Sequence, residues 1–86
     1  MTFRISKEVL AQELAGETVL LDLASENYFG LNAMGSRIWQ LLKEGQNKVG
    51  IVETLLLEYE AERDVLENDV NELLDRLDKA GLIEID

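Results

Sequence analysis

Hydrophobic residues change their spacing along the chain, and the change predicts strands first and helices afterwards. The segment Val9–Leu14 is ambiguous, whereas TVLLDL (18–23) and YFGL (28–31) have the length and the β-branched or aromatic content of strands. The turn-forming segments AGE (15–17) and ASEN (24–27) separate these runs. The first third of the chain is therefore expected to form an antiparallel three-stranded meander.

The third predicted strand runs directly into a helix. Alternation along this strand sends Phe29 and Leu31 to one face of the sheet and Tyr28 and Gly30 to the other. Asn32 suits the N-cap that follows, because its side-chain oxygen can accept from the free amides of a first helical turn. The segment thus joins a short aromatic strand to a helix through a single residue.

Two helices are predicted in the middle of the chain. The first spans 33–44 and ends at Gly45, and its apolar residues at helical spacing are Met34, Ile38, Leu41 and Leu42. Asn47 suits the cap of the second helix, although Gly50 weakens that helix by about 1 kcal/mol relative to alanine. The apolar stripe predicted for the second helix comprises Val49, Val52, Leu56 and Tyr59.

The third predicted helix is the best marked. Asp64 followed by Glu67 resembles a capping box, and Gly81 occupies the position of a C-terminal cap. The apolar face of this helix comprises Leu66, Val70, Leu73, Leu74 and Leu77. The expected fold class is α+β and winged helix-turn-helix-like: a three-stranded antiparallel sheet at the N-terminal side, three helices, and a short C-terminal β segment at LIEI (82–85).

The composition is typical of one small soluble domain. The 86 residues are 47% hydrophobic and charged residues recur throughout, which argues against a disordered tail and against a membrane span. Charges interrupt the N-terminal residues, so a secretory signal is not expected and the cytoplasm is the expected location. A chain of this length supports one core, and we expect a single domain over residues 1–86 that is a monomer or a weak dimer.

The net charge of −10 argues against nucleic-acid and membrane partners. Residues 1–43 carry four basic and five acidic side chains, whereas residues 44–86 carry four basic and thirteen acidic ones. A DNA-reading helix presents cations to phosphates. The third predicted helix instead displays mostly acids on its polar side: Glu67, Asp69, Glu72, Asp75 and Asp78 against Arg76 and Lys79.

Candidate chemistry is sparse. The chain has no histidine and no cysteine, which removes the commonest general base, nucleophilic thiol and transition-metal ligands. The acidic run ENDVNE (67–72) lacks the spacing of a calcium loop and lies within a helix, and the other carboxylates fall on polar helix faces. Trp39 is expected in the core or as a partly buried anchor, and not as a platform for a ligand. We therefore expect no enzyme activity, no metal site and no cofactor.

The segments VLLDLASENYFGLNAMGSRIWQLL (19–42) and LLLEYEAERDVLENDVNELLDRLDKAGLIE (55–84) together resemble a known family. The chain is similar to the PqqD-like peptide chaperones, named after the D protein of pyrroloquinoline quinone biosynthesis, and more closely to the stand-alone leader-recognition proteins of lasso-peptide pathways. The resemblance covers nearly the whole chain.

The resemblance implies a non-catalytic recognition element for ribosomally made, post-translationally modified peptides. It implies that the leader of a precursor peptide adds as an antiparallel strand to the third strand, beside the third helix, and is presented to a separate modifying enzyme or leader peptidase. Carried onto this sequence, the implied peptide-binding residues are Asn27, Tyr28, Phe29, Gly30, Leu31, Val70, Leu73 and Leu77.

Alternatives remain open at this point. The chain has KEG (43–45) where the pyrroloquinoline quinone proteins have Cys-Asp-Gly, which favours a lasso-like pathway over that cofactor pathway. A winged-helix module for a folded partner and an acidic DNA mimic or weak regulator are also compatible with the pattern. The NYFGL edge lacks proline and lysine, so it is either open for strand addition or covered by the LIEI segment or a dimer partner.

Overall fold

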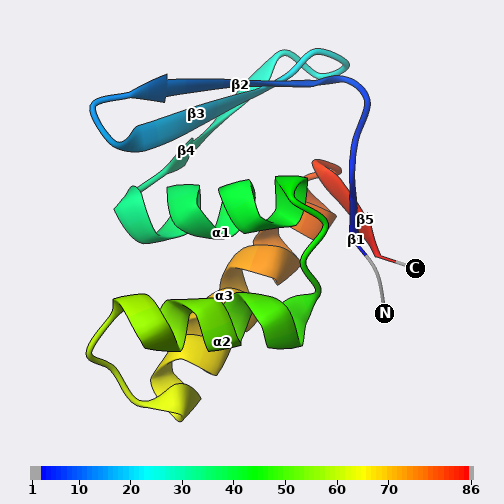
Figure 1. The fold of residues 1–86 in the computed structure, drawn as a ribbon. Coiled ribbons are helices and arrows are strands. Elements are labelled where there is room, and N and C mark those ends of the chain that lie inside the picture. Colours follow the sequence, from blue (N-terminus) through cyan, green and yellow to red (C-terminus); the bar gives the residue numbers. More distant parts are fainter. Residues whose placement is uncertain (1–2, 86) are drawn as a thin grey trace.

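The computed structural model describes residues 3–85, which form a three-stranded sheet, a two-stranded ribbon and three helices (Figure 1). The elements are β1 (Phe3–Ile5), β2 (Val9–Leu14), β3 (Glu17–Asp22), β4 (Asn27–Leu31), α1 (Ala33–Lys43), α2 (Lys48–Glu58), α3 (Arg63–Lys79) and β5 (Ile83–Ile85). The sheet forms one layer and the helices lie against one of its faces. The α+β prediction, with its sheet, three helices and C-terminal β segment, is confirmed.

The predicted meander is present, with β2, β3 and β4 paired antiparallel in chain order. A two-residue loop joins β2 to β3, and its residues Ala15 and Gly16 have φ of 53° and 84°. These are the angles of a type I′ turn, whose twist matches that of the flanking strands. The next turn is held by Asp22, whose carboxylate accepts from Ala24 N (3.1 Å) and Ser25 Oγ (2.8 Å). Together the two turns fix the direction in which β4 runs beside β3.

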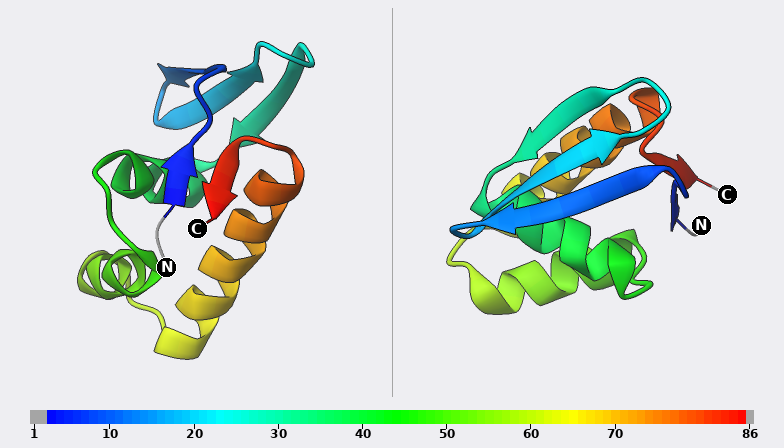
Figure 2. Two further views of the ribbon diagram at one scale, coloured as in Figure 1. Left: turned by 90° about the vertical axis from the view of Figure 1, so that its right-hand side faces the viewer. Right: turned by 90° about the horizontal axis from the view of Figure 1, so that it is seen from above.

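The ribbon of β1 and β5 lies apart from the three-stranded sheet (Figure 2). Phe3 opposes Ile85 and Ile5 opposes Ile83, and Ile83 is buried. The sequence prediction omits β1, because three residues whose partner lies at the other end of the chain leave no local pattern. The predicted C-terminal strand therefore forms, but it pairs with β1 and not with β4.

Two of the predicted helix caps are confirmed. The side-chain oxygen of Asn32 accepts from Gly35 N at 2.8 Å, and that of Asn47 accepts from Gly50 N at 2.8 Å. Each bond satisfies one of the amides that the first turn of a helix leaves without a backbone partner. Asn32 follows the last residue of β4, so the same cap fixes the sharp passage from strand to helix.

The predicted capping box of α3 is wrong. The helix starts two residues earlier than a cap at Asp64 would place it, at Arg63, with Glu62 as an N-cap that makes no side-chain capping bond. Asp64 consequently lies inside the first turn, where its charge is favourable beside the positive end of the helix dipole. The other end agrees with the sequence, because Gly81 follows the helix with φ of 76°, a left-handed conformation that glycine adopts without steric cost.

The apolar stripe predicted for α2 is wrong for two of its four members, whereas Val52 is buried and Leu56 packs partly buried against the core. The buried residues of α2 are Ile51, Val52 and Leu55. Val49 is 67% exposed, and Tyr59 lies beyond the last helical residue. Apolar side chains occupy six of the nine positions from 49 to 57, so the sequence contains more than one possible stripe and spacing alone does not select the buried one.

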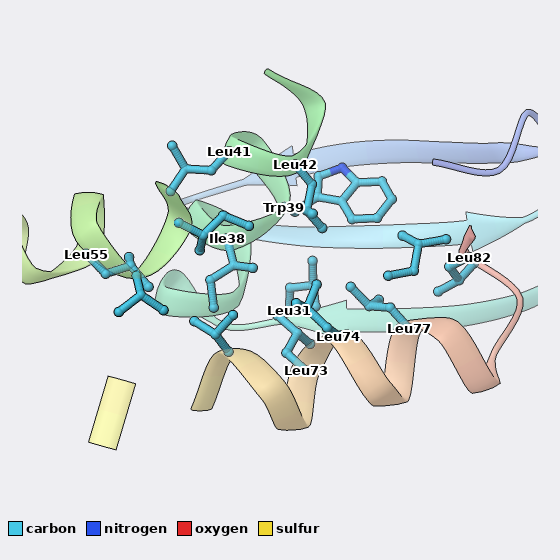
Figure 3. Packing of buried hydrophobic residues seen from close by; sticks show 14 of the residues in the cluster. Leu31, Ile38, Trp39, Leu41, Leu42, Leu55, Leu73, Leu74, Leu77 and Leu82 are labelled. Carbon is cyan, nitrogen blue, oxygen red and sulfur yellow. The ribbon is translucent and has the colours of Figure 1, made fainter. Parts of the chain in front are cut away.

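The core fills the space between the sheet and the helices (Figure 3). Trp39 is 3% exposed, which confirms its predicted place in the core. The sheet contributes Leu20 and Leu31, and α3 contributes every member of its predicted apolar face: Leu66, Val70, Leu73, Leu74 and Leu77. β4 and α3 are thereby held to the same core from opposite sides.

An ion pair links α1 to α2 and gives the first prediction. Arg37 donates to both carboxylate oxygens of Glu58, from Nε at 2.9 Å and from one terminal nitrogen at 2.7 Å. These hydrogen bonds lower the pKa of Glu58 below its ordinary value of 4.5. A carboxyl whose pKa is lowered by folding contributes stability above its unfolded pKa and loses that contribution as the pH falls through the folded pKa.

We therefore expect Glu58→Gln to lower the urea midpoint slightly near neutral pH, and the difference from the wild type to vanish as the pH falls well below 4.5. Urea unfolding of both proteins across this range checks it. Glu60→Gln, in the exposed loop after α2, is the control and should show no such convergence. A difference that is constant with pH would contradict the assignment.

Candidate peptide-binding site

The outer edge of β4 has no strand beside it in the part of the chain that the structure describes. β4 pairs with β3 on one side only, and β5, which the sequence left as a possible cover, pairs with β1. The opposite edge of the sheet, along β2, is also unpaired within residues 3–85. The sheet therefore offers two edges, and their surroundings differ.

Alternation in the sheet identifies the main-chain groups at the β4 edge. Leu23 N donates to Glu8 O at 2.8 Å. Hydrogen bonding alternates along an antiparallel strand, so the main-chain groups of Leu23 and of every second residue before it in β3 pair with β2. The other residues of β3 bond toward β4 and oppose Asn27, Phe29 and Leu31. The N–H and C=O groups of Tyr28 and Gly30 consequently point to the open edge.

This edge lacks the features that commonly block strand addition. The register between β3 and β4 runs without a bulge over all their pairs, from Thr18 opposite Leu31 to Asp22 opposite Asn27. Neither proline nor lysine occurs in β4. Proline, lysine and bulges are the usual means by which proteins prevent pairing at an exposed edge. The edge therefore carries none of these protections.

α3 runs along the β4 side of the sheet and forms a wall beside the open edge (Figure 2). The guanidinium carbon of Arg76 lies 5.0 Å from the centre of the Phe29 ring, within cation–π distance. Phe29 is half-buried against the core, and Arg76 is exposed. The pair marks the middle of a groove whose sides are β4 and α3.

Two hollows extend this groove in opposite directions. One of about 290 Å³ lies where β4 meets α1, and its apolar lining comprises Leu31, Met34, Ile38 and Leu73. The other, of about 270 Å³, lies at the start of β4 and is lined in part by Asn27, Tyr28, Phe29 and Lys79. Residue numbers rise along β4 while they fall along α3, so the two elements border the groove in antiparallel directions.

The charged lining of the groove comes from α3. Asp69, Glu72 and Arg76 border the larger hollow, and Lys79 borders the other. Lys79 donates to the carboxylate of Asp75 at 2.9 Å, and this bond raises the pKa of Lys79. A ligand in the groove would therefore meet apolar surface at the bottom and both signs of charge along the α3 side.

The structure brings five of the eight sequence-predicted residues together as β4 itself, Asn27–Leu31, and places Leu73 opposite them. Figure 3 shows Leu31, Leu73 and Leu77 pointing into the space between β4 and α3. Leu73 is 8% exposed and lines the larger hollow, whereas Val70 and Leu77 are 0% exposed. In this structure Val70 and Leu77 are therefore enclosed in the core beneath the groove, and Leu73 is the member of the three that lines the hollow.

The sequence-based site omitted several residues that line the groove. Asp69 and Arg76 lie four residues before and three residues after Leu73, so helical spacing places them on the same side of α3. That spacing could have identified them once Leu73 was chosen. Met34 could not be found in this way, because it belongs to α1 and borders the hollow only once α1 and α3 are packed together.

Within the described part of the chain, the structure shows no group of three or more carboxylates that could hold a metal ion. None of the helices of residues 3–85 has the length and apolar character needed to cross a membrane. The distinctive feature of the surface is thus an unpaired strand edge beside a partly apolar groove.

An open edge of this kind is typical of domains that bind a peptide as an added strand. Comparison with known proteins identifies the family. The chain belongs to the PqqD family: the model of the family described as coenzyme PQQ synthesis protein D matches residues 17–83. A search of curated protein sequences finds no match.

Two solved structures are similar to the chain over nearly its whole length. TbiB1 in complex with the TbiA(beta) leader peptide is 41% identical, with a TM-score of 0.90, and the match covers 94% of each chain. A lasso peptide synthetase B1 complexed with its leader peptide is 31% identical, with a TM-score of 0.88, and the match covers 96% of this chain and 98% of the other.

The burial of Leu77 gives a second prediction. Leu77→Ala removes a side chain that is 0% exposed, so we expect it to lower the free energy of unfolding by about 2–5 kcal/mol. Leu57→Ala, at a side chain that is 89% exposed, should change it by about 0.5 kcal/mol or less. Urea titration measures both. Equal, small effects would place Leu77 at the groove surface instead of in the core.

Proposed function

We propose that this chain binds the leader peptide of a ribosomally made precursor as an additional antiparallel strand on β4. The observation that carries the proposal is the unpaired edge at Tyr28 and Gly30, which faces a groove formed with α3. Membership of the PqqD family and the similarity to two proteins solved with leader peptides support it. The leader would occupy a winged-helix-like scaffold at its strand edge and not at a DNA-reading helix.

Main-chain and side-chain contacts would have separate roles in this complex. The outward N–H and C=O groups of Tyr28 and Gly30 would pair with the leader backbone, which supplies affinity that depends little on sequence. Alternate leader side chains would enter the groove, where Leu31, Met34 and Leu73 offer apolar surface. Selection among leaders would then depend on the fit of these side chains.

The chain would act as a carrier and not as a catalyst. It has no histidine or cysteine, so it has no nucleophilic thiol and no imidazole to act as a base. We propose that it presents the precursor, in the cytoplasm, to a separate modifying enzyme or leader peptidase. A lasso-like pathway is favoured over pyrroloquinoline quinone synthesis because both solved relatives are leader-bound and one is a lasso peptide synthetase component.

The decisive experiment is a fluorescence-anisotropy titration with the labelled leader of the precursor peptide encoded beside the gene. We expect saturable binding with a Kd near or below about 1 µM, equivalent to about 8 kcal/mol. An isolated leader should suffice, whereas a module that recognises a folded partner would need the whole partner. Absence of binding by the folded protein would overturn the proposal.

Proline substitutions test which edge is used. Gly30→Pro removes an N–H that points to the open edge and leaves the bonds between β3 and β4 in place, so we expect leader binding to weaken by about tenfold or more. Ala11→Pro makes the matching change on β2, whose residue 11 points to the opposite edge by the same alternation.

Circular dichroism should show that both proline variants remain folded, and Ala11→Pro should bind as the wild type does. Loss of binding in Ala11→Pro with normal binding in Gly30→Pro would assign the leader to β2. Normal binding in both variants would exclude strand addition as the mode of recognition.

A further inference from the structure

Gly30 has no evident function within its own chain. Its φ lies outside the left-handed region, and a Cβ atom built at this position would meet no atom within 4 Å. Neither an unusual backbone conformation nor close packing therefore requires glycine here. Glycine within a strand nevertheless lowers stability by roughly 0.5–1 kcal/mol relative to alanine. The position is open on the side of the sheet that faces away from the helices.

A small hollow occupies this open position. Its volume is about 140 Å³, and it is lined by Glu17, Thr18, Val19, Gly30 and Leu31. The side chains of Thr18 and Leu31 are buried on the helix side, so the hollow opens on the outer face, where Val19 lies directly opposite Gly30.

Strand addition would place one leader residue beside this hollow. Because the N–H and C=O groups of Gly30 point to the open edge, an antiparallel strand bonded to them has one residue directly opposite Gly30. The side chain of that residue lies on the outer face of the sheet. With no side chain on Gly30 in the way, it can reach Val19 on the next strand.

We propose that the leader residue opposite Gly30 is aromatic, and that its ring lies across Gly30 and contacts Val19. This inference rests on the proposed strand addition and extends it, because it assigns a second recognition surface on the face of the sheet opposite to the groove. A flat ring over a strand glycine restores the packing that the glycine lacks. Tyr28, which is 73% exposed on the same face, flanks the ring along β4.

Nuclear magnetic resonance of the methyl-labelled protein tests the contact directly. The probe is the leader of the precursor encoded beside the gene, together with versions in which each aromatic residue is replaced singly by alanine. We expect the Val19 methyl resonances to move upfield on binding, because they would lie over the ring. One alanine replacement should abolish this shift and weaken binding about fivefold to tenfold.

Gly30→Val fills the hollow and supplies the second arm. It should still bind the leader, as reported by amide shifts at Tyr28, but without the upfield shift of Val19. The alanine replacement should weaken binding to Gly30→Val less than it weakens binding to the wild type, because the ring no longer lies across position 30 in that variant. The Leu10 methyls, on the same face but on β2, should stay unshifted throughout and serve as the internal control.

The possible outcomes separate the two proposals. If the wild type binds the leader with amide shifts along β4 while the Val19 methyls do not move, the aromatic contact is overturned and strand addition stands. A shift that no single alanine replacement abolishes also overturns the contact. If β4 amides do not respond to any leader, strand addition fails, and the contact fails with it.

Discussion

The one-sided pairing of β4 is the constraint on which the rest of the structure depends. A strand of five residues with one free edge must be held by other means, and here each of its boundaries is fixed. The Asp22 turn fixes its start, Leu31 is buried in the core near its end, and Asn32 caps the helix that follows. None of these anchors uses the outer N–H and C=O groups, so within residues 3–85 these groups remain free without loosening the strand.

A free edge also explains how so short a chain can offer a surface for the proposed strand addition. An 86-residue chain buries too little of its surface to enclose a large cavity, and the hollows here are open grooves on the surface. Recognition through the main chain avoids the need for an enclosed cavity, because the strand supplies donors and acceptors in a fixed array. The helices then need to shape only one side of a strand added in the proposed way.

Local features of the fold could be predicted from the sequence, whereas contacts between distant segments could not. The meander and the caps at Asn32 and Asn47 depend on neighbouring residues, and the structure confirms them. The β1–β5 ribbon depends on the two ends of the chain meeting, which no local pattern records. It is this pairing that takes the C-terminal strand away from β4.

The candidate site shows the same division. β4 could be identified because its aromatic alternation is a local pattern. On α3, Val70, Leu73 and Leu77 belong to one apolar stripe, and spacing alone cannot tell which of them reaches the surface. In the structure Leu73 lines the larger hollow, whereas Val70 and Leu77 are enclosed. The contact between Phe29 and Arg76 likewise joins residues of β4 and α3 that lie far apart in the sequence and meet only in the fold.

The acidic outer side of α3 has a further consequence, for colloidal behaviour. Two copies of the chain that joined through their β4 edges would bring two α3 helices, each with exposed Asp69, Glu72, Asp75 and Asp78, to the sides of the shared sheet. Mutual repulsion between these helices opposes such self-association in dilute buffer and is screened as ionic strength rises. The chain can thus keep an unprotected strand edge in solution through its charge, and concentrated salt is the condition under which that protection fails.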